Sequence, residues 1–419
     1  MGSMFGRYAS KLEFKRSHAR LLQRQHITEV EPGSILHDFE SLLRYVRKQP
    51  LRVTGTHQLP LSSLQEINAR LYHPLKLGLT RPQQKSYPPI HGLYLLLRAS
   101  GLTYLDETGS KPQLMVDQEL AAHWEMLNLT ERYGTLLETW LLRAHPEIVG
   151  ERAHAFFHDI PENYDNWLSL FIRLTTRPDE MPDYLQYTPG WHNLGLLELF
   201  GFLEIEQGAP VPGEGWQITA LRSTPFGEAL LTLLHTEFFS DLQRVLALAT
   251  EGDIPPGLLQ PLLRPYFPAW EQTLPLPTEN PFREGSHIFK VTLWKGLWRR
   301  LAVPAEAALE QLASAILNAY NFDHDHLYDF RYKNRLGIEE HIYHPYMDEG
   351  PWVSAVRVGE IPLQPGQRMT FLYDYGDQWE FEVRLEGIHP ADTEVKIRVL
   401  EAEGEAPEQY PQWEEDEGW

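Results

Sequence analysis

The chain has 419 residues, of which 37 are Lys or Arg and 58 are Asp or Glu, so its formal net charge is −21. A content of 42% hydrophobic and 12% aromatic residues excludes a disordered chain and, at this length, predicts two or three folded domains. The absence of cysteine from the sequence excludes disulfides, thiolate zinc sites, thiolate-bound iron–sulfur clusters and a cysteine nucleophile. No apolar run approaches the ~18 residues that mark a membrane span, so we expect no membrane partner and a cytoplasmic location.

The N-terminal region, residues 5–250, is patterned mainly as helix. Residues 5–25 are its one clearly basic segment, which we interpret as a solvated terminus in preference to a nucleic-acid contact. Ser62 and Ser63 are placed to cap a helix that runs to about Leu71. Helical spacing of apolar residues is found at residues 35–46, 64–71, 117–144 and 162–176.

An internal repeat suggests the architecture of this region. Residues 96–102 and 196–202 share an apolar pattern and a glycine that ends a helix. Each copy is followed by a short β-like run, a turn and a second run, which is the order of a winged helix. We therefore expect two winged-helix-like units, at about 35–145 and 150–250. Winged helices often read DNA, but the parts of the chain on either side of residue 280 are both net acidic, which disfavours phosphate contacts.

Residues 251–285 contain eight prolines, which disfavours a continuous helix or a central strand. The segment is predicted to be a linker or interdomain strap. Its apolar side chains, among them Leu259, Leu263 and Trp270, indicate that it packs on a surface and is not a free tether.

The C-terminal domain, residues 286–400, is predicted to be α+β with a mainly antiparallel sheet. Pro304 is placed to open a helix whose apolar stripe runs from Leu309 to Tyr320. Strands are predicted at residues 289–293, 369–374, 379–386 and 395–399.

Four ordered motifs in this domain carry a family resemblance: FKVTL at 289–293, LWRRLAVP at 297–304, HLYDF at 326–330 and YDYGDQWE at 373–380. The domain, over about 283–400, resembles the Ri-plasmid open-reading-frame-three-like family, also labelled a TnpR-like passenger of insertion elements. The resemblance implies an α+β fold and an association with plasmids and mobile elements, and it brings no established reaction. The family commonly has a histidine where this sequence has Phe381, so any role of that imidazole is absent here.

The motif residues suited to binding or to structure are Trp298, Arg299, Arg300, His326, Asp374, Gly376, Asp377 and Trp379. Turn chemistry accounts for the Asp and Gly residues, because Asp bonds its own backbone and Gly supplies a positive φ. The alternative is a divalent-metal site for phosphodiester hydrolysis. Its ligands would be His324, His326, Asp374 and Asp377. We favour the structural interpretation.

Two further groups have both a functional and a structural interpretation. His341 and His344 have a spacing that zinc can use, with Asp348 and Glu349 close behind, but Pro345 predicts a loop in which such residues are ordinary polar surface. The two arginines of Trp298-Arg299-Arg300 are expected to face opposite sides of a strand. One of them should pair with sheet carboxylates in preference to a phosphate or base.

Residues 401–419 include eight acidic residues and no basic ones, and we expect an acidic, largely disordered tail. Its aromatic residues, Tyr410, Trp413 and Trp419, are typical anchors for a protein partner. A solubilising tail is the alternative.

The chain contains no P-loop, dinucleotide-binding or Gly-x-Ser-x-Gly pattern, and nothing in it indicates a cofactor. We therefore favour a non-enzymatic interaction or adaptor protein in plasmid or mobile-element physiology, acting on a protein partner. Two alternatives stay open: a metal-dependent nuclease or hydrolase, and a DNA-binding protein that acts through the winged-helix-like units.

Overall fold

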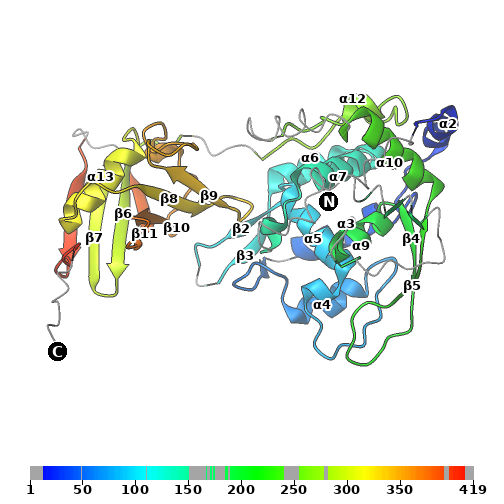
Figure 1. The fold of residues 1–419 in the computed structure, drawn as a ribbon, viewed down its shortest axis with the longest axis horizontal. Helices are drawn as coiled ribbons and strands as arrows, with labels where there is room; N and C mark the ends of the chain where they lie inside the picture. Colours follow the sequence, from blue (N-terminus) through cyan, green and yellow to red (C-terminus); the bar gives the residue numbers. More distant parts are fainter. Residues whose placement is uncertain are drawn as a thin grey trace, which may run out of the picture. The chain divides into compact units, whose positions relative to one another are not determined.

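The computed structural model describes residues 13–48, 50–109, 111–150, 189–239, 254–277, 282–390 and 396–410, with short pieces between 167 and 186. The chain divides into two compact units (Figure 1). The helical unit comprises Met1–Asp106 and Lys111–Pro277, and the C-terminal unit comprises Thr278–Trp419 with Glu107–Ser110. The predicted α+β class is confirmed. Within the described ranges, no helix has the length and hydropathy needed to cross a bilayer.

The helical unit contains short strands between its helices. Its helices are α2 (Arg16–Arg24), α3 (Ile35–Arg47), α4 (Leu61–Asn68), α5 (Pro88–Ala99), α6 (Gln118–Met126), α7 (Leu129–Arg143), α9 (Trp191–Leu199), α10 (Pro225–Glu237) and α12 (Gln260–Leu263). Its strands are β1 (Leu51–Arg52), β2 (Thr103–Asp106), β3 (Gln113–Val116), β4 (Leu203–Gln207) and β5 (Ile218–Ser223). The strands form a sheet of order β1-β3-β2 and a hairpin of β4 and β5.

The helix predicted over 35–46 is confirmed as α3, and two other boundaries differ from the prediction. Capping by Ser62 and Ser63 is wrong, because α4 begins directly after Pro60 and both serines lie inside it. The pattern over 117–144 is two helices, because Asn128 caps α7 by accepting from the Glu131 backbone amide at 3.0 Å. Most of 162–176 lies outside the described residues.

The predicted order of helix, strand, turn and strand is present in both copies, as α5-β2-β3 and α9-β4-β5. Gly101 and Gly201 follow their helices with φ of +77° and +78°, which a residue with a Cβ atom rarely adopts. That these are winged-helix units stays a prediction.

Helices α5 and α9 pack against each other through glycines. A Cβ atom at Gly92 would lie 2.6 Å from Leu196 Cγ, and one at Gly195 would lie 2.9 Å from the Pro89 nitrogen. Every residue of α5 is buried. The helices that precede the two hairpins are therefore interior elements of this unit.

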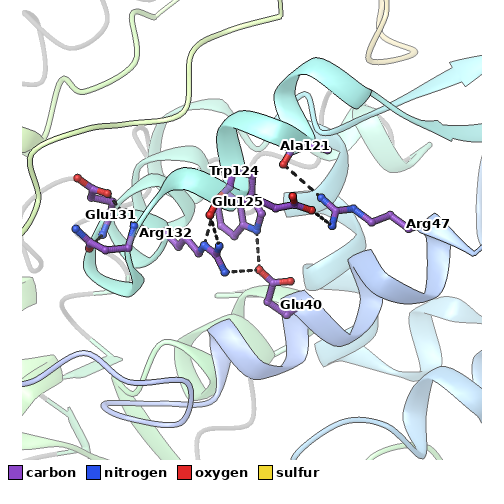
Figure 2. A network of polar contacts seen from close by, with 8 residues as sticks. Glu40, Arg47, Ala121, Trp124, Glu125, Glu131 and Arg132 are labelled. Atoms are coloured by element: carbon purple, nitrogen blue, oxygen red, sulfur yellow. Dashed lines mark hydrogen bonds and ion pairs between the residues drawn. The ribbon is translucent and has the colours of Figure 1, made fainter.

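A polar network joins α3 to the corner between α6 and α7 (Figure 2). Glu40 accepts from Trp124 Nε1 at 2.6 Å and from Arg132 Nη1 at 2.9 Å. Arg132 also donates to the Trp124 carbonyl at 3.2 Å, and Arg47 pairs with Glu125 at 2.6 Å. The network gives the N–H group of the buried Trp124 indole a hydrogen-bond acceptor.

The described part of the proline-rich segment, residues 254–277, packs on α7 and is here called the strap. The buried carboxylate of Glu138 accepts from the backbone amides of Gly257 at 2.7 Å and Leu259 at 2.9 Å. Glu131 accepts from the amide of Gln272 at 2.8 Å. The strap is thus fastened to the helical unit by two carboxylates of one helix.

Glu198 in α9 makes the stability of the helical unit depend on pH. Burial, aided by the Asp38 carboxylate, raises the pKa of Glu198 from 4.5 to about 7. Between these values the folded state holds a proton that the unfolded state has lost, so stability falls as pH rises from about 4.5 to 7 and levels off above. The fall should be about 3 kcal/mol. Glu198→Gln is expected to flatten this dependence in urea unfolding followed by far-UV circular dichroism. An unchanged slope would contradict the assignment.

The C-terminal unit is a seven-stranded sheet with one long helix. Its strands lie in the order β12-β7-β6-β11-β10-β8-β9, and all paired strands are antiparallel. The elements are β6 (Ser286–Trp294), β7 (Leu297–Pro304), α13 (Leu309–Tyr320), β8 (Tyr328–Lys333), β9 (Glu339–Tyr343), the 3-10 helix η4 (Val358–Glu360), β10 (Arg368–Tyr373), β11 (Trp379–His389) and β12 (Arg398–Glu403).

Helix α13 lies across one face of this sheet and buries the core (Figure 1). The strands predicted around 289–293, 369–374 and 379–386 are confirmed. Phe381 lies in this core, with its ring centroid 5.0 Å from that of Tyr320. The prediction that Pro304 opens the helix is wrong: Pro304 ends β7, and α13 begins after Ala308, whose amide donates to Gln311 Oε1 at 3.0 Å.

The prediction of disorder from residue 401 is wrong for residues 401–410. Residues 401–403 belong to β12, which pairs with β7. Two of their side chains bind groups of β7: Glu401 pairs with Arg300, and Glu403 accepts from Trp298 Nε1 at 2.6 Å. Gln409 is buried and accepts from the Asp323 amide at 2.6 Å. Residues 411–419, with Trp413 and Trp419, lie outside the described residues.

Candidate functional site

The two arginines of β7 face opposite sides of the sheet, as predicted. Arg299 faces α13 and is buried, with its guanidinium 4.6 Å from the Tyr320 ring centroid. It donates to the carbonyls of Ala319 and Glu403 at 2.8 Å, of Trp298 at 2.9 Å and of Gly404 at 3.2 Å. This side chain therefore ties β12 to the end of α13.

Arg300 occupies the outer face and pairs with Glu386 at 2.6 Å and with Glu401, so the predicted pairing with sheet carboxylates is confirmed. The Trp298 ring lies 4.4 Å from Lys290 Nζ and 5.2 Å from the Arg300 guanidinium. These cationic side chains are thus engaged by groups of the same sheet.

Asp374 bonds its own backbone in the turn between β10 and β11, as the sequence predicted: its Oδ1 accepts from the Gly376 amide at 2.8 Å, and its carbonyl accepts from the Gln378 amide at 2.7 Å. The prediction that Gly376 supplies a positive φ is wrong, because the positive φ values of this turn, +58° and +55°, belong to Asp374 and Gln378. Asp374 Oδ2 lies 3.5 Å from His326 Nδ1, and His326 Nε2 lies 3.0 Å from the Tyr410 hydroxyl. The imidazole therefore bridges this turn and the C-terminal segment.

The four side chains of the alternative metal site do not converge. His326 and Asp374 lie together, whereas His324 contacts Asn318 at 3.2 Å and Asp377 is exposed at the tip of the turn. Over the described ranges, no group of three His, Asp or Glu side chains is close enough to hold a metal ion.

The motif residue Trp379 packs against another aromatic side chain: its ring centroid lies 4.9 Å from that of Phe322.

His341 and His344 do not form a common site. His341 lies in β9, not in the predicted loop, and its Nδ1 lies 2.9 Å from Asp329 Oδ2. His344 follows the strand, packs edge-on at 4.7 Å against Tyr328, and accepts from the Tyr346 amide at 3.2 Å.

Asp329 is a buried carboxylate to which the sequence analysis assigned no role. It is 1% exposed and lies between Arg331 Nε at 3.0 Å and His341 Nδ1 at 2.9 Å. Burial and the Asp329 charge raise the pKa of nearby Tyr375 to about 12, so that phenol stays protonated near neutral pH. In the sequence, the signal for a structural role of Asp329 is its position between Tyr328 and Phe330 in a strand rich in aromatic residues. The contact of its carboxylate with His341 links β8 to β9 on the outer face of the sheet.

Residues 344–352, here called the aromatic loop, are ordered although they present large aromatic rings. Tyr346 is 85% exposed and Trp352 is 41% exposed. Trp352 Nε1 donates to the Met347 carbonyl at 3.0 Å, and the Met347 amide donates to the His344 carbonyl at 2.9 Å. The loop is closed where the Tyr343 amide donates to the Pro351 carbonyl at 2.8 Å. Such a loop can offer aromatic anchors at little further loss of entropy.

Comparison with known proteins finds a family match for most of the C-terminal unit. Residues 288–410 match the family described as plasmid pRiA4b ORF-3-like protein. The C-terminal domain is a plasmid pRiA4b ORF-3-like domain. The predicted resemblance is thereby confirmed, and the match extends to Tyr410, the partner of His326.

Two similar proteins are described without a function. The uncharacterized protein y4hQ of Sinorhizobium fredii (strain NBRC 101917 / NGR234) is 29% identical over 113 residues, which cover 26% of this chain and 56% of that protein. The chain thus spans about half the length of this relative. The crystal structure of MM3350, a protein of unknown function from Methanosarcina mazei Go1, is similar with 27% identity and a TM-score of 0.26, covering 28% of this chain and 70% of that one.

The Asp374 turn of the ORF-3-like domain gives a test of its structural role. Asp374→Ala removes the bond to the Gly376 amide and places alanine at positive φ, so we expect a loss of about 1–2 kcal/mol. Asp374→Asn keeps an acceptor and tolerates this backbone, and should lose less than about 0.5 kcal/mol. Asp377→Ala, in the same turn, is the matched control with no expected change. Urea unfolding of the full chain measures all three, and equal losses for Ala and Asn would contradict the turn assignment.

Proposed function

We propose that this protein is a non-enzymatic interaction or adaptor protein associated with plasmid or mobile-element physiology. It contacts a protein partner through the aromatic loop of the ORF-3-like domain. The observation that carries the proposal is the exposure of Tyr346 and Trp352 on a loop that is already closed by its own hydrogen bonds. Aromatic residues held in place are the usual energetic centres of protein interfaces. Asp348 and Glu349 in the same loop favour a partner surface with basic groups around an apolar centre.

The DNA-binding alternative is less well supported. A recognition helix must be exposed to enter the major groove, whereas every residue of α5 is buried and α9 packs against it. On the outer sheet face, Arg300 and Arg368 are paired with glutamates. Basic groups already neutralised in this way gain little from phosphate contacts.

The hydrolase alternative needs a set of side chains that converge on one ion or one scissile bond. His326 and Asp374 are instead used to join a turn to the C-terminal segment, and His324 faces Asn318. This geometry favours an architectural role for the motif residues.

Fluorescence anisotropy tests the proposal against its nearest rival. Labelled duplex and single-stranded DNA are titrated with the full chain and with a chain ending after Tyr410, at low and at physiological salt. This endpoint keeps β12 and Gln409 while removing the last acidic residues. We expect no binding by either form. Binding whose affinity falls steeply with salt would overturn the proposal in favour of DNA recognition.

A further inference from the structure

The aromatic loop is fastened to one edge of the seven-stranded sheet. Tyr343, the last residue of the edge strand β9, forms a bridge with Trp352, and the Val353 amide donates to the Tyr343 carbonyl at 2.9 Å. Near the start of the loop, the Tyr346 ring packs edge-on against the His344 ring, with the two centroids 5.0 Å apart. Both exposed rings are therefore held in place by contacts within the ORF-3-like domain.

One face of the Trp352 indole is covered by the loop itself. A Cβ atom built at Gly350 would lie 3.4 Å from each of Trp352 Cδ2, Cε2 and Cε3. A point equally distant from these three neighbouring ring atoms lies above the ring plane, so the Gly350 backbone covers that face. The Nε1–H group is engaged as well, because it donates to the Met347 carbonyl at 3.0 Å. A further group can therefore stack on this ring only from the opposite face.

Trp352 has no stacking partner within the part of the chain that the structure describes. Neither a described aromatic ring nor a described cationic side chain lies over it, although the residue is 41% exposed. Trp298 differs, because Lys290 Nζ lies 4.4 Å and the Arg300 guanidinium 5.2 Å from its ring centroid. The face of an indole carries the negative part of the ring quadrupole and attracts cations. Trp352 can therefore accept from a partner the contact that Trp298 receives from its own sheet.

The loop also carries two carboxylates that no described cation neutralises. Asp348 and Glu349 are exposed, and neither carboxylate forms a hydrogen bond or an ion pair with a described residue. Burial raises the pKa of Tyr343, and the charges of Asp329 and Glu349 add to this rise. Glu349 thus acts on the residue that bridges to Trp352, so its charge is felt beside the indole.

A third carboxylate comes from the start of α13. The Glu310 amide donates to the Val353 carbonyl at 3.1 Å, next to the end of the loop. Burial lowers the pKa of His344 and the Glu310 charge opposes this shift, so Glu310 is within electrostatic reach of the loop. Arg357, which follows the loop, is already paired with two other glutamates. The surroundings of the exposed rings are therefore net negative and favour a cationic group.

We propose that the aromatic loop binds an arginine side chain of its protein partner, with the guanidinium stacked on the face of Trp352 opposite Gly350 and paired with Asp348 or Glu349. Arginine suits this arrangement better than lysine, because its planar guanidinium lies flat on an indole and presents parallel N–H groups to a carboxylate. The inference rests on the proposed function, since it names the chemical group by which the partner is recognised.

Fluorine NMR of the full chain labelled with fluorotryptophan tests this contact without the partner. The Trp352 resonance is identified as the one that Trp352→Phe lacks. The probe is N-acetyl-arginine amide at constant ionic strength, added to about 50 mM because a single side chain should bind in the millimolar range. We expect the Trp352 resonance to shift to saturation. N-acetyl-citrulline amide has a similar shape without the charge, and should bind at least about fivefold more weakly.

Charge variants test the acidic half of the site. Asp348→Asn combined with Glu349→Gln should weaken binding of the arginine probe about threefold to tenfold. Glu405→Gln combined with Glu408→Gln is the matched control, because it removes the same charge from exposed positions of the C-terminal segment and should leave binding unchanged. N-acetyl-lysine amide should bind more weakly than the arginine probe.

A Trp352 resonance that does not move, or that moves equally with citrulline or lysine, would overturn the proposal. So would an acidic double variant that binds like wild type. These outcomes are separate from the fate of the proposed function, which photo-cross-linking from position 346 tests. A cross-linked partner without arginine binding would defeat this inference alone, whereas arginine binding without a cross-linked protein would count against the adaptor function alone.

Discussion

Replacing Glu138 by alanine is expected to lower the free energy of unfolding of the helical unit by about 3–5 kcal/mol. The carboxylate is 0% exposed and accepts from the amides of Gly257 and Leu259, and Arg143 Nη1 lies 3.2 Å from it. Alanine is a better helix former than glutamate, so the loss comes from the partners. Two strap amides and a guanidinium would be left without this acceptor, which is itself fully buried.

Urea unfolding followed by far-UV circular dichroism measures this loss, since the helices dominate that signal. Glu138→Gln retains one carbonyl acceptor without the charge and should lie between wild type and alanine. Glu125→Ala is the matched control, because that glutamate has a side chain 63% exposed and its ion pair contributes little. If Glu138→Ala proves no more destabilising than Glu125→Ala, the strap is not held in the way described.

Arg299→Ala should lower the free energy of unfolding of the ORF-3-like domain by about 2–4 kcal/mol. The buried guanidinium donates to four backbone carbonyls, two of them at the end of β12, and packs on Tyr320. Lysine carries a single ammonium group in place of this planar fork, so Arg299→Lys should recover less than half of the loss.

Hydrogen exchange of the full chain locates the effect of Arg299→Ala. We expect the amides of β12 to exchange faster, together with those at the end of α13. Arg300→Ala, one residue along the same strand but on the outer face, should cost less than about 1 kcal/mol and leave exchange in α13 unchanged. Equal effects of the two substitutions would show that burial on the α13 side has no special role.

Local patterns were sufficient for much of the ORF-3-like domain. Strand alternation is a property of neighbouring residues, and it correctly located β6, β10 and β11 and predicted the opposite faces of Arg299 and Arg300. The turn at Asp374 was predictable for the same reason, because its bonds run to residues two and four positions ahead.

Contacts between distant residues were not predictable. Glu138 reads as an ordinary helical glutamate, because its partners Gly257 and Leu259 come 119 and 121 residues later. Composition also misled at residues 401–410, since an acidic segment can form a strand where it meets Arg300 and Trp298. Exposure of the aromatic loop depends on how Trp352 bridges to Tyr343, which a single sequence does not reveal.

The central claim, that a protein partner binds at the aromatic loop, is tested most directly by site-specific cross-linking. A photo-reactive phenylalanine analogue replaces Tyr346 in the full chain, which is illuminated in the cells that encode it, and adducts are identified by mass spectrometry. The same analogue at Lys333, near the same edge but outside the loop, is the control. We predict a discrete adduct with another protein at position 346, absent at position 333 and lost when Trp352→Ala is added. If position 346 gives no adduct beyond those at position 333, or gives one that Trp352→Ala leaves unchanged, the claim is contradicted.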